Sequence, residues 1–266
     1  MARILAIANQ KGGVGKTTTS VNLSACLATL GQRVLMIDLD PQGNATTGCG
    51  IVKREALPTV YQMLIGAASL QEATLKTDYG FDILPSNREL AGAEVELIEV
   101  EQREYRLRDA LVAAGDSYDF ILIDCPPALN MLTVNGLVAA QAVMIPMQCE
   151  YYALEGLTDL VATLRKVRAH LNPVLEIEGL LRTMYDPRST LTQQVSSELE
   201  SHFSGKVYNS IIPRNVRLAE APSYGKPVIA FDKNSRGALA YLSLAQELLD
   251  RRAGTANATN ATSSLQ

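Results

Sequence analysis

A glycine-rich loop near the N-terminus, Lys11-Gly-Gly-Val-Gly-Lys-Thr-Thr18, constrains this sequence more than any other segment. It follows an apolar run at 3–8 and opens a stretch in which Val21, Ala25 and Ala28 recur at helical spacing. Glycines let backbone N–H groups turn toward an anion without a Cβ in the way, and the N-terminus of a helix adds a positive dipole. The chain is therefore predicted to bind phosphate groups at a strand, loop and helix junction.

The same loop carries the residue types that hold a nucleotide. Lys16 is expected to reach the β- and γ-phosphates, and the Thr17 hydroxyl is expected to ligate Mg²⁺. This pattern predicts a Mg²⁺-dependent ATPase with ATP and Mg²⁺ as its ligands. The loop residues expected to contact them are Lys11, Gly12, Gly13, Val14, Gly15, Lys16, Thr17 and Thr18.

Three carboxylates are predicted to lie beside the phosphate site. Asp38 ends the apolar run at 33–38, Asp40 follows it, and Asp124 ends the apolar run at 120–124. Ligands of such sheets bind at the carboxyl ends of the strands. We expect Asp124 to hold Mg²⁺ through water and Asp38 to lie on the metal side. For Asp38 and Asp40 the alternative is a carboxylate that only caps a turn.

Short apolar runs alternate with longer helix-periodic stretches along the chain, which is the pattern of an α/β fold. The fold class expected is a single-domain, mostly parallel twisted sheet with helices on both faces, spanning 1–252. The small, polar segment 253–266 is expected to be a disordered tail. Strands are predicted at 3–8, 33–38, 81–84, 120–124, 142–147, 177–182 and 207–211. Helices are predicted at 88–114, 154–171, 190–203 and 235–252, besides the one after the loop.

Charge is distributed unevenly over the 266 residues, whose formal net charge is −4. Residues 1–159 carry 11 Lys+Arg against 19 Asp+Glu (net −8), and residues 160–266 carry 13 against 9 (net +4). Any nucleic-acid surface is therefore expected in the C-terminal part. Apolar runs are too short for a membrane span, so we expect a cytoplasmic chain without membrane partners. The four cysteines are widely spaced, which favours buried apolar roles.

Several segments together resemble the ParA/Soj family of DNA-partitioning ATPases, over about residues 2–250. Lys11 adds a second lysine to the loop, as in the deviant Walker A subgroup to which that family belongs. The segments that carry the resemblance are Asp40-Pro-Gln-Gly-Asn-Ala-Thr46, Leu90-Ala-Gly-Ala-Glu94, Asp124-Cys-Pro-Pro127, Gln148-Cys-Glu-Tyr-Tyr-Ala-Leu-Glu-Gly156, Ile212-Pro-Arg-Asn-Val-Arg-Leu218 and Glu220-Ala-Pro-Ser-Tyr-Gly-Lys-Pro227.

The resemblance implies roles in an ATP-bound homodimer. Lys11 would cross the interface to the partner's ATP, and Glu150 would approach the partner's nucleotide. Asp40 would orient the attacking water, which makes Lys11, Lys16 and Asp40 the expected catalytic residues. Pro213 and its neighbours would line the adenine pocket.

The resemblance also implies partners. The dimer would bind double-stranded DNA without sequence preference through Arg188 and Arg217, each of which has a solvated arginine as its alternative. A ParB/Spo0J-like centromere-binding protein would stimulate hydrolysis and release the DNA, so a nucleoid-associated location is expected. The chain starts directly at its first predicted strand, so operator recognition by an N-terminal helix-turn-helix is not expected.

Other members of the deviant Walker A subgroup are weaker matches. A MinD-like membrane ATPase needs a basic amphipathic C-terminal helix, which the segment after Arg252 lacks. A nitrogenase-iron-protein-like reductase needs cluster-binding cysteines, and a cobyrinate-type amide synthase usually adds a glutaminase domain. A MinD-like positioning ATPase or a partition-like ATPase for another cargo stays the alternative. Chromosome and plasmid cargo are not distinguished by the sequence.

Overall fold

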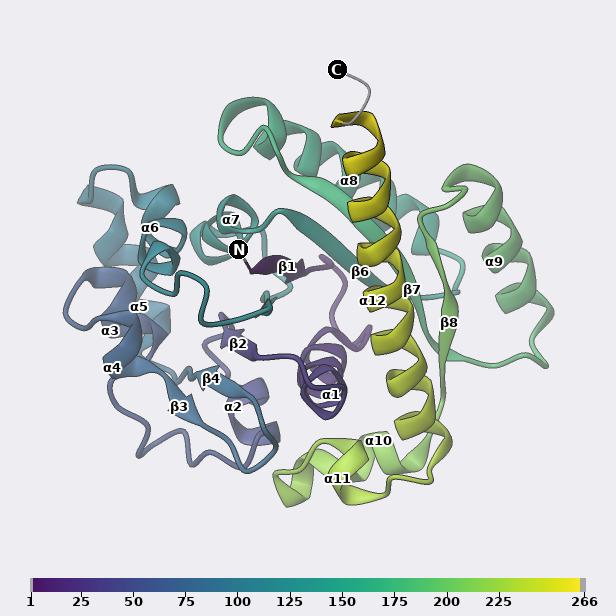
Figure 1. Cartoon of the computed structure of the whole chain (residues 1–266), viewed down its shortest axis with the longest axis horizontal. Helices are drawn as coiled ribbons and strands as arrows, with labels where there is room; N and C mark the ends of the chain where they lie inside the picture. The colour runs from purple at the N-terminus through teal and green to yellow at the C-terminus, as the bar shows by residue number, and fades with distance from the viewer. Residues whose placement is uncertain (1, 264–266) are drawn as a thin grey trace.

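The computed structural model describes residues 2–263, with side chains through residue 254, as a twisted sheet between two layers of helices (Figure 1). The described strands form one eight-stranded sheet in the order β3-β4-β2-β5-β1-β6-β7-β8. All neighbouring strands are parallel except β3 and β4. The strands are β1 (Arg3–Ile7), β2 (Val34–Asp38), β3 (Leu75–Lys76), β4 (Asp82–Leu84), β5 (Phe120–Asp124), β6 (Ala142–Gln148), β7 (Glu176–Tyr185) and β8 (Val207–Pro213).

Helices cover both faces of the sheet, which confirms the predicted α/β architecture. One face packs against α3 (Val60–Ile65), α4 (Leu70–Ala73), α5 (Leu90–Glu96), α6 (Arg106–Val112), α7 (Met131–Ala139), α8 (Ala153–His170) and α9 (Thr190–His202). The other packs against α1 (Lys16–Thr29), α2 (Asn44–Gly48), α11 (Val228–Phe231) and α12 (Arg236–Ser263), with α10 (Val216–Glu220) beside them.

Successive residues of the central strands enter different cores. In β2, Leu35 and Ile37 belong to the core under α3 to α9, while Val34 and Met36 belong to the core under α1 and α12. Because side chains alternate across a strand and both faces are buried, the strand is apolar throughout. This is why the continuous apolar runs of the sequence located the strands within a few residues.

The long helix predicted at 88–114 is wrong, because this segment is broken. It forms α5, the short 3₁₀ turns Leu97–Glu99 and Arg103–Tyr105, and then α6. Asn135 of α7 accepts from the Leu107 N–H and donates to the Arg103 carbonyl. A side chain from elsewhere in the chain therefore supplies hydrogen bonds that an unbroken helix would make within itself. The two-residue strand β3 was also missed, since so short a segment carries no periodicity.

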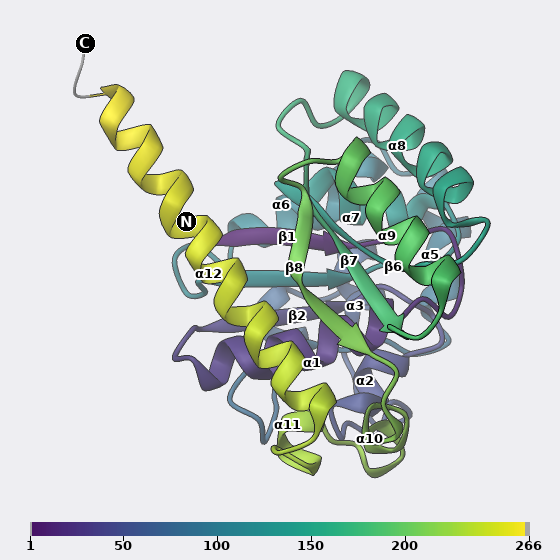
Figure 2. The same ribbon diagram turned by 90° about the vertical axis from the view of Figure 1, so that its right-hand side faces the viewer.

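The last helix, α12, is longer than predicted and continues from Arg236 to Ser263. The segment beyond residue 252 contains several alanines, the residue with the highest helix propensity, and extending an existing helix costs little free energy. Figure 2 shows α12 beside β8, with its last turns projecting beyond the sheet. A domain boundary at 252 with a disordered tail stays a prediction, and its last residues, 264–266, lie outside the described residues.

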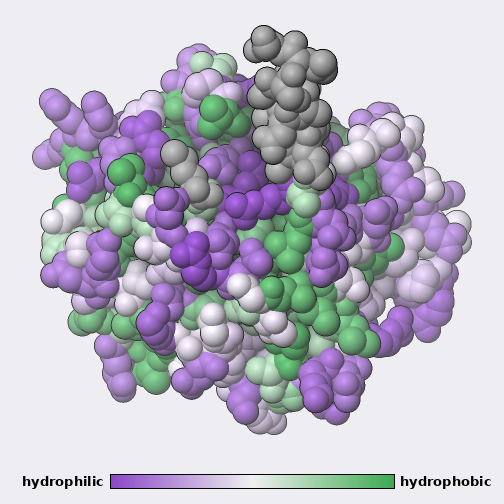
Figure 3. Space-filling model, viewed as in Figure 1, coloured by the Kyte–Doolittle hydropathy of each residue, from purple (hydrophilic) through white to green (hydrophobic). Residues whose placement is uncertain are grey.

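Apolar side chains gather over the crevice between α1 and α12 (Figure 3), where a cavity of about 550 Å³ is lined by residues including Ala25, Ile229 and Leu242. The four cysteines are buried, as predicted. No described helix has an apolar stretch long enough to cross a bilayer.

Candidate nucleotide-binding site

The glycine-rich loop connects the central strand β1 to α1 at the carboxyl edge of the sheet. Gly13 and Gly15 have φ of 72° and 89°, in the left-handed region where a side chain is strained. The loop can take this path only because glycines occupy these positions. The structure thus confirms the strand, loop and helix order that the sequence predicted, and it places the N-terminus of α1 at the open edge of the sheet.

Lys16, the first residue of α1, is buried despite its charge. Its side chain folds back over the loop, and Nζ donates to the Lys11 carbonyl at 3.0 Å. Burial lowers the pKa of Lys16, while the nearby Asp124 carboxylate acts in the opposite direction. A buried ammonium that can exchange one backbone carbonyl for phosphate oxygens suits the role predicted for Lys16.

Two buried carboxylates lie side by side where β2 and β5 end. Asp38 and Asp124 are register partners across these strands and are almost completely buried. Burial raises the pKa of both carboxyls, and for Asp124 the Asp38 charge raises it further. Two buried carboxylates in this position are stable only when one is protonated or when a cation lies beside them.

Asp124 has a carboxylate oxygen that is free to bind a metal ion. Its Oδ1 accepts from the Ser20 hydroxyl at 2.9 Å, whereas its Oδ2 is buried and has no hydrogen-bond partner within the described residues. Among all the residues that the structure describes, no group of three or more His, Cys, Asp or Glu side chains could hold a metal alone. Mg²⁺ is typically bound by one or two protein groups, water and phosphate oxygens. Although burial raises the pKa of the Asp124 carboxyl, the Thr17 hydroxyl lies close enough to act in the opposite direction, so Asp124 and Thr17 together fit Mg²⁺ that arrives with a nucleotide.

Both carboxylate oxygens of Asp38 already accept hydrogen bonds. Its Oδ2 accepts from the Thr46 N–H and hydroxyl, each at 2.8 Å, and its Oδ1 accepts from the Asp40 N–H at 3.1 Å. These bonds hold the turn after β2 in place, which is the alternative that the sequence left open. Its position beside Asp124 agrees with the expected metal side, but a direct role as metal ligand stays a prediction.

Asp40 is half-buried in the turn between β2 and α2. Its Oδ1 accepts from the Gln42 N–H at 2.9 Å, and its charge acts on both Lys16 and Asp124. The Ser86 hydroxyl donates to the Asp40 carbonyl at 2.8 Å. Sequence reasoning missed Ser86, because nothing in its neighbourhood marks it as a partner of a residue 46 positions away. The water-orienting role of Asp40 stays a prediction.

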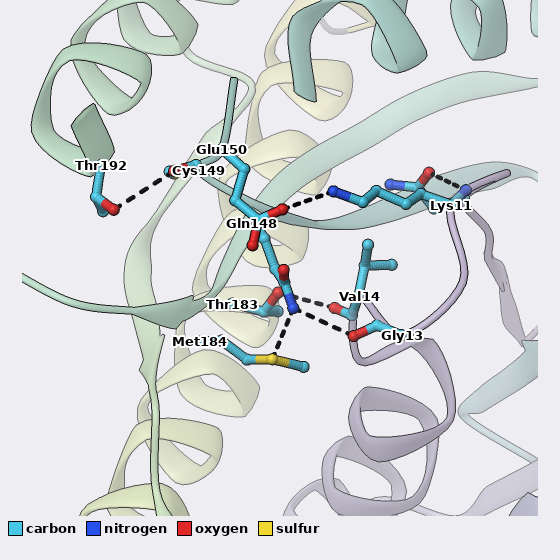
Figure 4. Close-up of polar contacts among 10 residues, drawn as sticks. Lys11, Gly13, Val14, Gln148, Cys149, Glu150, Thr183, Met184 and Thr192 are labelled. Atoms are coloured by element: carbon cyan, nitrogen blue, oxygen red, sulfur yellow. Dashed lines mark hydrogen bonds and ion pairs between the residues drawn. The ribbon is translucent and has the colours of Figure 1, made fainter. Parts of the chain in front are cut away.

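Lys11 and Glu150, which the sequence assigned to a dimer interface, meet within one chain. Lys11 Nζ lies 2.7 Å from Glu150 Oε2, and both side chains are about half exposed (Figure 4). The ion pair joins the loop to the segment after β6. Contacts of either residue with a partner's nucleotide stay predictions.

A cavity of about 250 Å³ opens beside the loop. Pro213, predicted to lie near the adenine, is in its wall. Sequence analysis did not predict the lining residues from β7 and α12, since these elements lie far from Pro213 along the chain. The lining residues are Gly15, Thr18, Thr183, Met184, Ile212, Pro213, Arg214, Asn215, Leu218, Ala219 and Tyr241.

The two arginines predicted to bind DNA follow neighbouring strands. The β7–β8 register pairs Tyr185 with Pro213, so the segments that carry Arg188 and Arg217 leave the sheet side by side. Arg188 binds Asp186 through Nε and Nη2 at 3.0 and 2.9 Å. Arg217 lies 2.8 Å from Glu220. Both guanidinium groups are exposed, and DNA binding by them stays a prediction.

Comparison with known proteins gives consistent results. The sequence profile of a family described as AAA domain matches residues 2–177. The chain is 55% identical over 249 residues to the sporulation initiation inhibitor protein Soj of Bacillus subtilis, covering 93% of this chain and 98% of Soj.

A second relative and a solved structure extend this result. The chromosome partitioning protein ParA of Caulobacter vibrioides is 54% identical over 252 residues, covering 94% of each chain. A crystal structure named cobyrinic acid a,c-diamide synthase from Mycobacterium smegmatis, with bound ADP and magnesium, superposes with a TM-score of 0.82 at 39% identity, covering 94% of each chain.

Proposed function

Because this chain belongs to the ParA/Soj family of chromosome-partitioning ATPases, we propose that it hydrolyses Mg²⁺-ATP in a cycle that controls its binding to DNA. The observation that carries the proposal is the buried charge at the loop. Lys16 and the unpartnered Oδ2 of Asp124 lie at the start of α1 and the end of β5, where they can receive phosphates and Mg²⁺. The partitioning relatives are 54–55% identical, against 39% for the structure named for cobyrinic acid amidation.

Each residue of the site has a separate role in phosphoryl transfer, a reaction that depends mainly on positioning and charge stabilisation. Backbone N–H groups of the loop and the Lys16 ammonium hold the β- and γ-phosphates. Thr17 and Asp124 hold Mg²⁺, which supplies charge neutralisation for the phosphate oxygens. Asp40, tied into its turn by Gln42 and Ser86, orients the attacking water.

Dimerisation and DNA binding follow from ATP binding in this proposal. Lys11 and Glu150 exchange their mutual ion pair for contacts with the partner's nucleotide, at small cost since half-exposed pairs contribute about 1 kcal/mol or less. Arg188 and Arg217 then contact phosphates of double-stranded DNA. Two subunits double the contacts, so a weak site becomes effective in the dimer.

A ParB/Spo0J-like centromere-binding partner stimulates hydrolysis and thereby releases the DNA. In the cell, this cycle places the protein in the cytoplasm on the nucleoid. Residues 1–252 form the ATPase domain in this proposal, and the tail takes no part in the cycle.

One experiment tests the proposal as a whole. Binding of a labelled DNA duplex of arbitrary sequence is measured with ATP, with ADP and without nucleotide, in the presence and absence of anionic phospholipid vesicles. We expect ATP-dependent DNA binding that vesicles do not compete away. Nucleotide-independent binding would contradict the cycle, and ATP-dependent capture by the vesicles would favour a MinD-like function.

A further inference from the structure

Two polar side chains from β6 and β7 hold the side of the glycine-rich loop that faces these strands. They belong neither to the loop nor to the carboxylate pair Asp38 and Asp124. Gln148 ends β6 and Thr183 lies near the end of β7, and the two are register partners across these strands (Figure 4). Gln148 Nε2 donates to the Gly13 carbonyl at 3.2 Å, and Thr183 Oγ1 donates to the Val14 carbonyl at 2.8 Å. Two neighbouring side chains of the sheet therefore hold two consecutive carbonyls of the loop.

These bonds fix which way the loop amides point. A trans peptide is planar, with its C=O and the following N–H directed to opposite sides. When Gln148 and Thr183 draw the carbonyls of Gly13 and Val14 toward β6 and β7, the N–H groups of Val14 and Gly15 are turned the other way. Neither N–H donates to an acceptor within the described part of the chain, so both remain available to an anion.

The Thr183 hydroxyl makes its hydrogen bond in the interior of the protein. Thr183 is only 2% exposed and Val14 only 1%, so the hydrogen bond between them is shielded from bulk solvent. A Cβ added to Gly15 would lie 3.8 Å from Thr183 Cγ2, which places the threonine methyl against the next turn of the loop. Thr183 and Gly15 both line the 250 Å³ cavity.

Backbone strain marks the same position. Met184, directly after Thr183, has φ of 47°, a left-handed conformation that is unfavourable for a methionine. Its thioether contacts Gln148 Nε2, so the same amide that holds the Gly13 carbonyl also touches the strained residue. Such strain persists where the surrounding structure imposes it, and it concentrates at functional sites.

We propose that Thr183 and Gln148 are positioning residues for the nucleotide phosphates. By holding the Val14 and Gly13 carbonyls outward, they keep the Gly15 and Val14 amides preorganised toward the phosphate chain. This inference rests on the proposed ATP-binding function and extends it to residues outside the loop. Its consequence is specific: loss of either hydrogen bond weakens the phosphate contribution to binding and leaves the nucleoside contribution unchanged.

The test uses the full-length chain with Thr183→Val, which keeps the shape of the side chain and removes its hydroxyl. Affinities for ATP, ADP and adenosine are measured by competition with a fluorescent ATP analogue in the presence of Mg²⁺. We expect ATP and ADP to bind about tenfold more weakly, the effect of leaving one buried carbonyl unsatisfied. Adenosine affinity should stay within about twofold, and Thr183→Ser, which restores the donor, should recover most of the loss.

Two further variants keep the result interpretable. Thr74→Val removes a threonine hydroxyl that donates to the Leu70 carbonyl at the far edge of the sheet, and it should leave nucleotide affinity unchanged. Gln148→Met removes the other donor and should weaken ATP binding by about threefold, which tests the inference even where Thr183→Val does not fold.

The outcomes separate this inference from the proposed function. Wild-type affinity for ATP in both Thr183→Val and Gln148→Met overturns the positioning role alone. Equal losses in Thr183→Val and Thr183→Ser also overturn it, because the donor would then be irrelevant. A wild-type chain that binds neither ATP nor ADP overturns the proposed function together with this inference.

Discussion

The nucleotide site and the two exposed arginines differ in how the fold holds their charges. At the nucleotide site, Lys16, Asp38 and Asp124 are buried, and the pairing of β2 with β5 places Asp124 beside Asp38 while Ser20 of α1 donates to Asp124. Arg188 and Arg217 are exposed. Arg188 pairs with Asp186, two residues away. Arg217 pairs with Glu220, three residues away, and with Asp232 at 3.4 Å. The first arrangement depends on the pairing of the strands, and the second consists of ion pairs at the surface.

This difference predicts different responses to mutation. Buried charges cost several kcal/mol unless they are compensated, so their removal has large effects that are specific to the ligand. Exposed ion pairs contribute about 0–1 kcal/mol and exchange partners readily, so these arginines are free to leave their carboxylates for DNA phosphates.

The largest effect is expected for Lys16→Ala. The loop then lacks the buried ammonium that neutralises the phosphates, and loss of one such contact costs about 10²–10³-fold. ATP-dependent dimerisation, measured by size-exclusion chromatography with light scattering, should be abolished. Lys76→Ala, which removes an exposed lysine on the edge strand β3, should dimerise normally. If Lys16→Ala still dimerises with ATP, the buried lysine is not the phosphate ligand.

Asp40→Ala should separate binding from hydrolysis. The side chain touches neither the phosphate loop nor Asp124 through a hydrogen bond, so Mg²⁺-ATP should still bind. Without an oriented water, turnover should fall by about 10²-fold, and the protein should accumulate as an ATP-bound dimer. Phosphate release and light scattering measure the two effects. Turnover at the wild-type rate would leave Asp40 as a turn residue only.

Asp124→Asn should make the nucleotide-free protein more stable while it removes Mg²⁺-dependent hydrolysis. Burial and the Asp38 charge raise the pKa of Asp124, so the protonated form is favoured in the folded state. That contribution to stability is present at acidic pH and is lost as the pH rises through the raised pKa. An amide relieves the repulsion, by about 1–2 kcal/mol, or about 2–8 °C in Tm for a chain of this size.

The check is thermal denaturation at pH 7 to 8 with and without Mg²⁺-ATP. The wild type should gain Tm with the ligand, and Asp124→Asn should gain much less. A variant that is less stable than the wild type without ligand would show that the carboxyl has a structural role here.

The smallest effects are expected at the exposed arginines. Arg188→Ala and Arg217→Ala should each weaken DNA binding by a few fold and reduce the salt dependence by about one phosphate contact per subunit. ATP-dependent dimerisation should be unchanged. Arg33→Ala is the matched control. Arg33 is also exposed and paired with a carboxylate, Asp119, but both lie at the amino ends of β2 and β5, away from the carboxyl ends of β7 and β8 that carry Arg188 and Arg217. If both single variants and the double variant bind DNA like wild type at matched salt, the DNA site lies elsewhere.

The sequence by itself determined the sheet, the loop and the order of the chemistry along the chain. Apolar runs located the buried strands because both faces of a parallel sheet exclude polar residues. The loop 11–18 and Asp124 were predicted because their roles depend on local spacing at the ends of strands. Glycines at positions 13 and 15 have the left-handed backbone that a phosphate loop requires.

Only the tertiary structure decided which distant groups share one site. It broke the predicted helix 88–114 because Asn135 supplies hydrogen bonds there, and it paired Lys11 with Glu150 across 139 positions. It also brought Gln148 and Thr183 against the side of the loop that faces β6 and β7. A single glutamine or threonine at a strand end carries no periodicity and no motif, so its partner is set only when the strands pair and the register places its side chain.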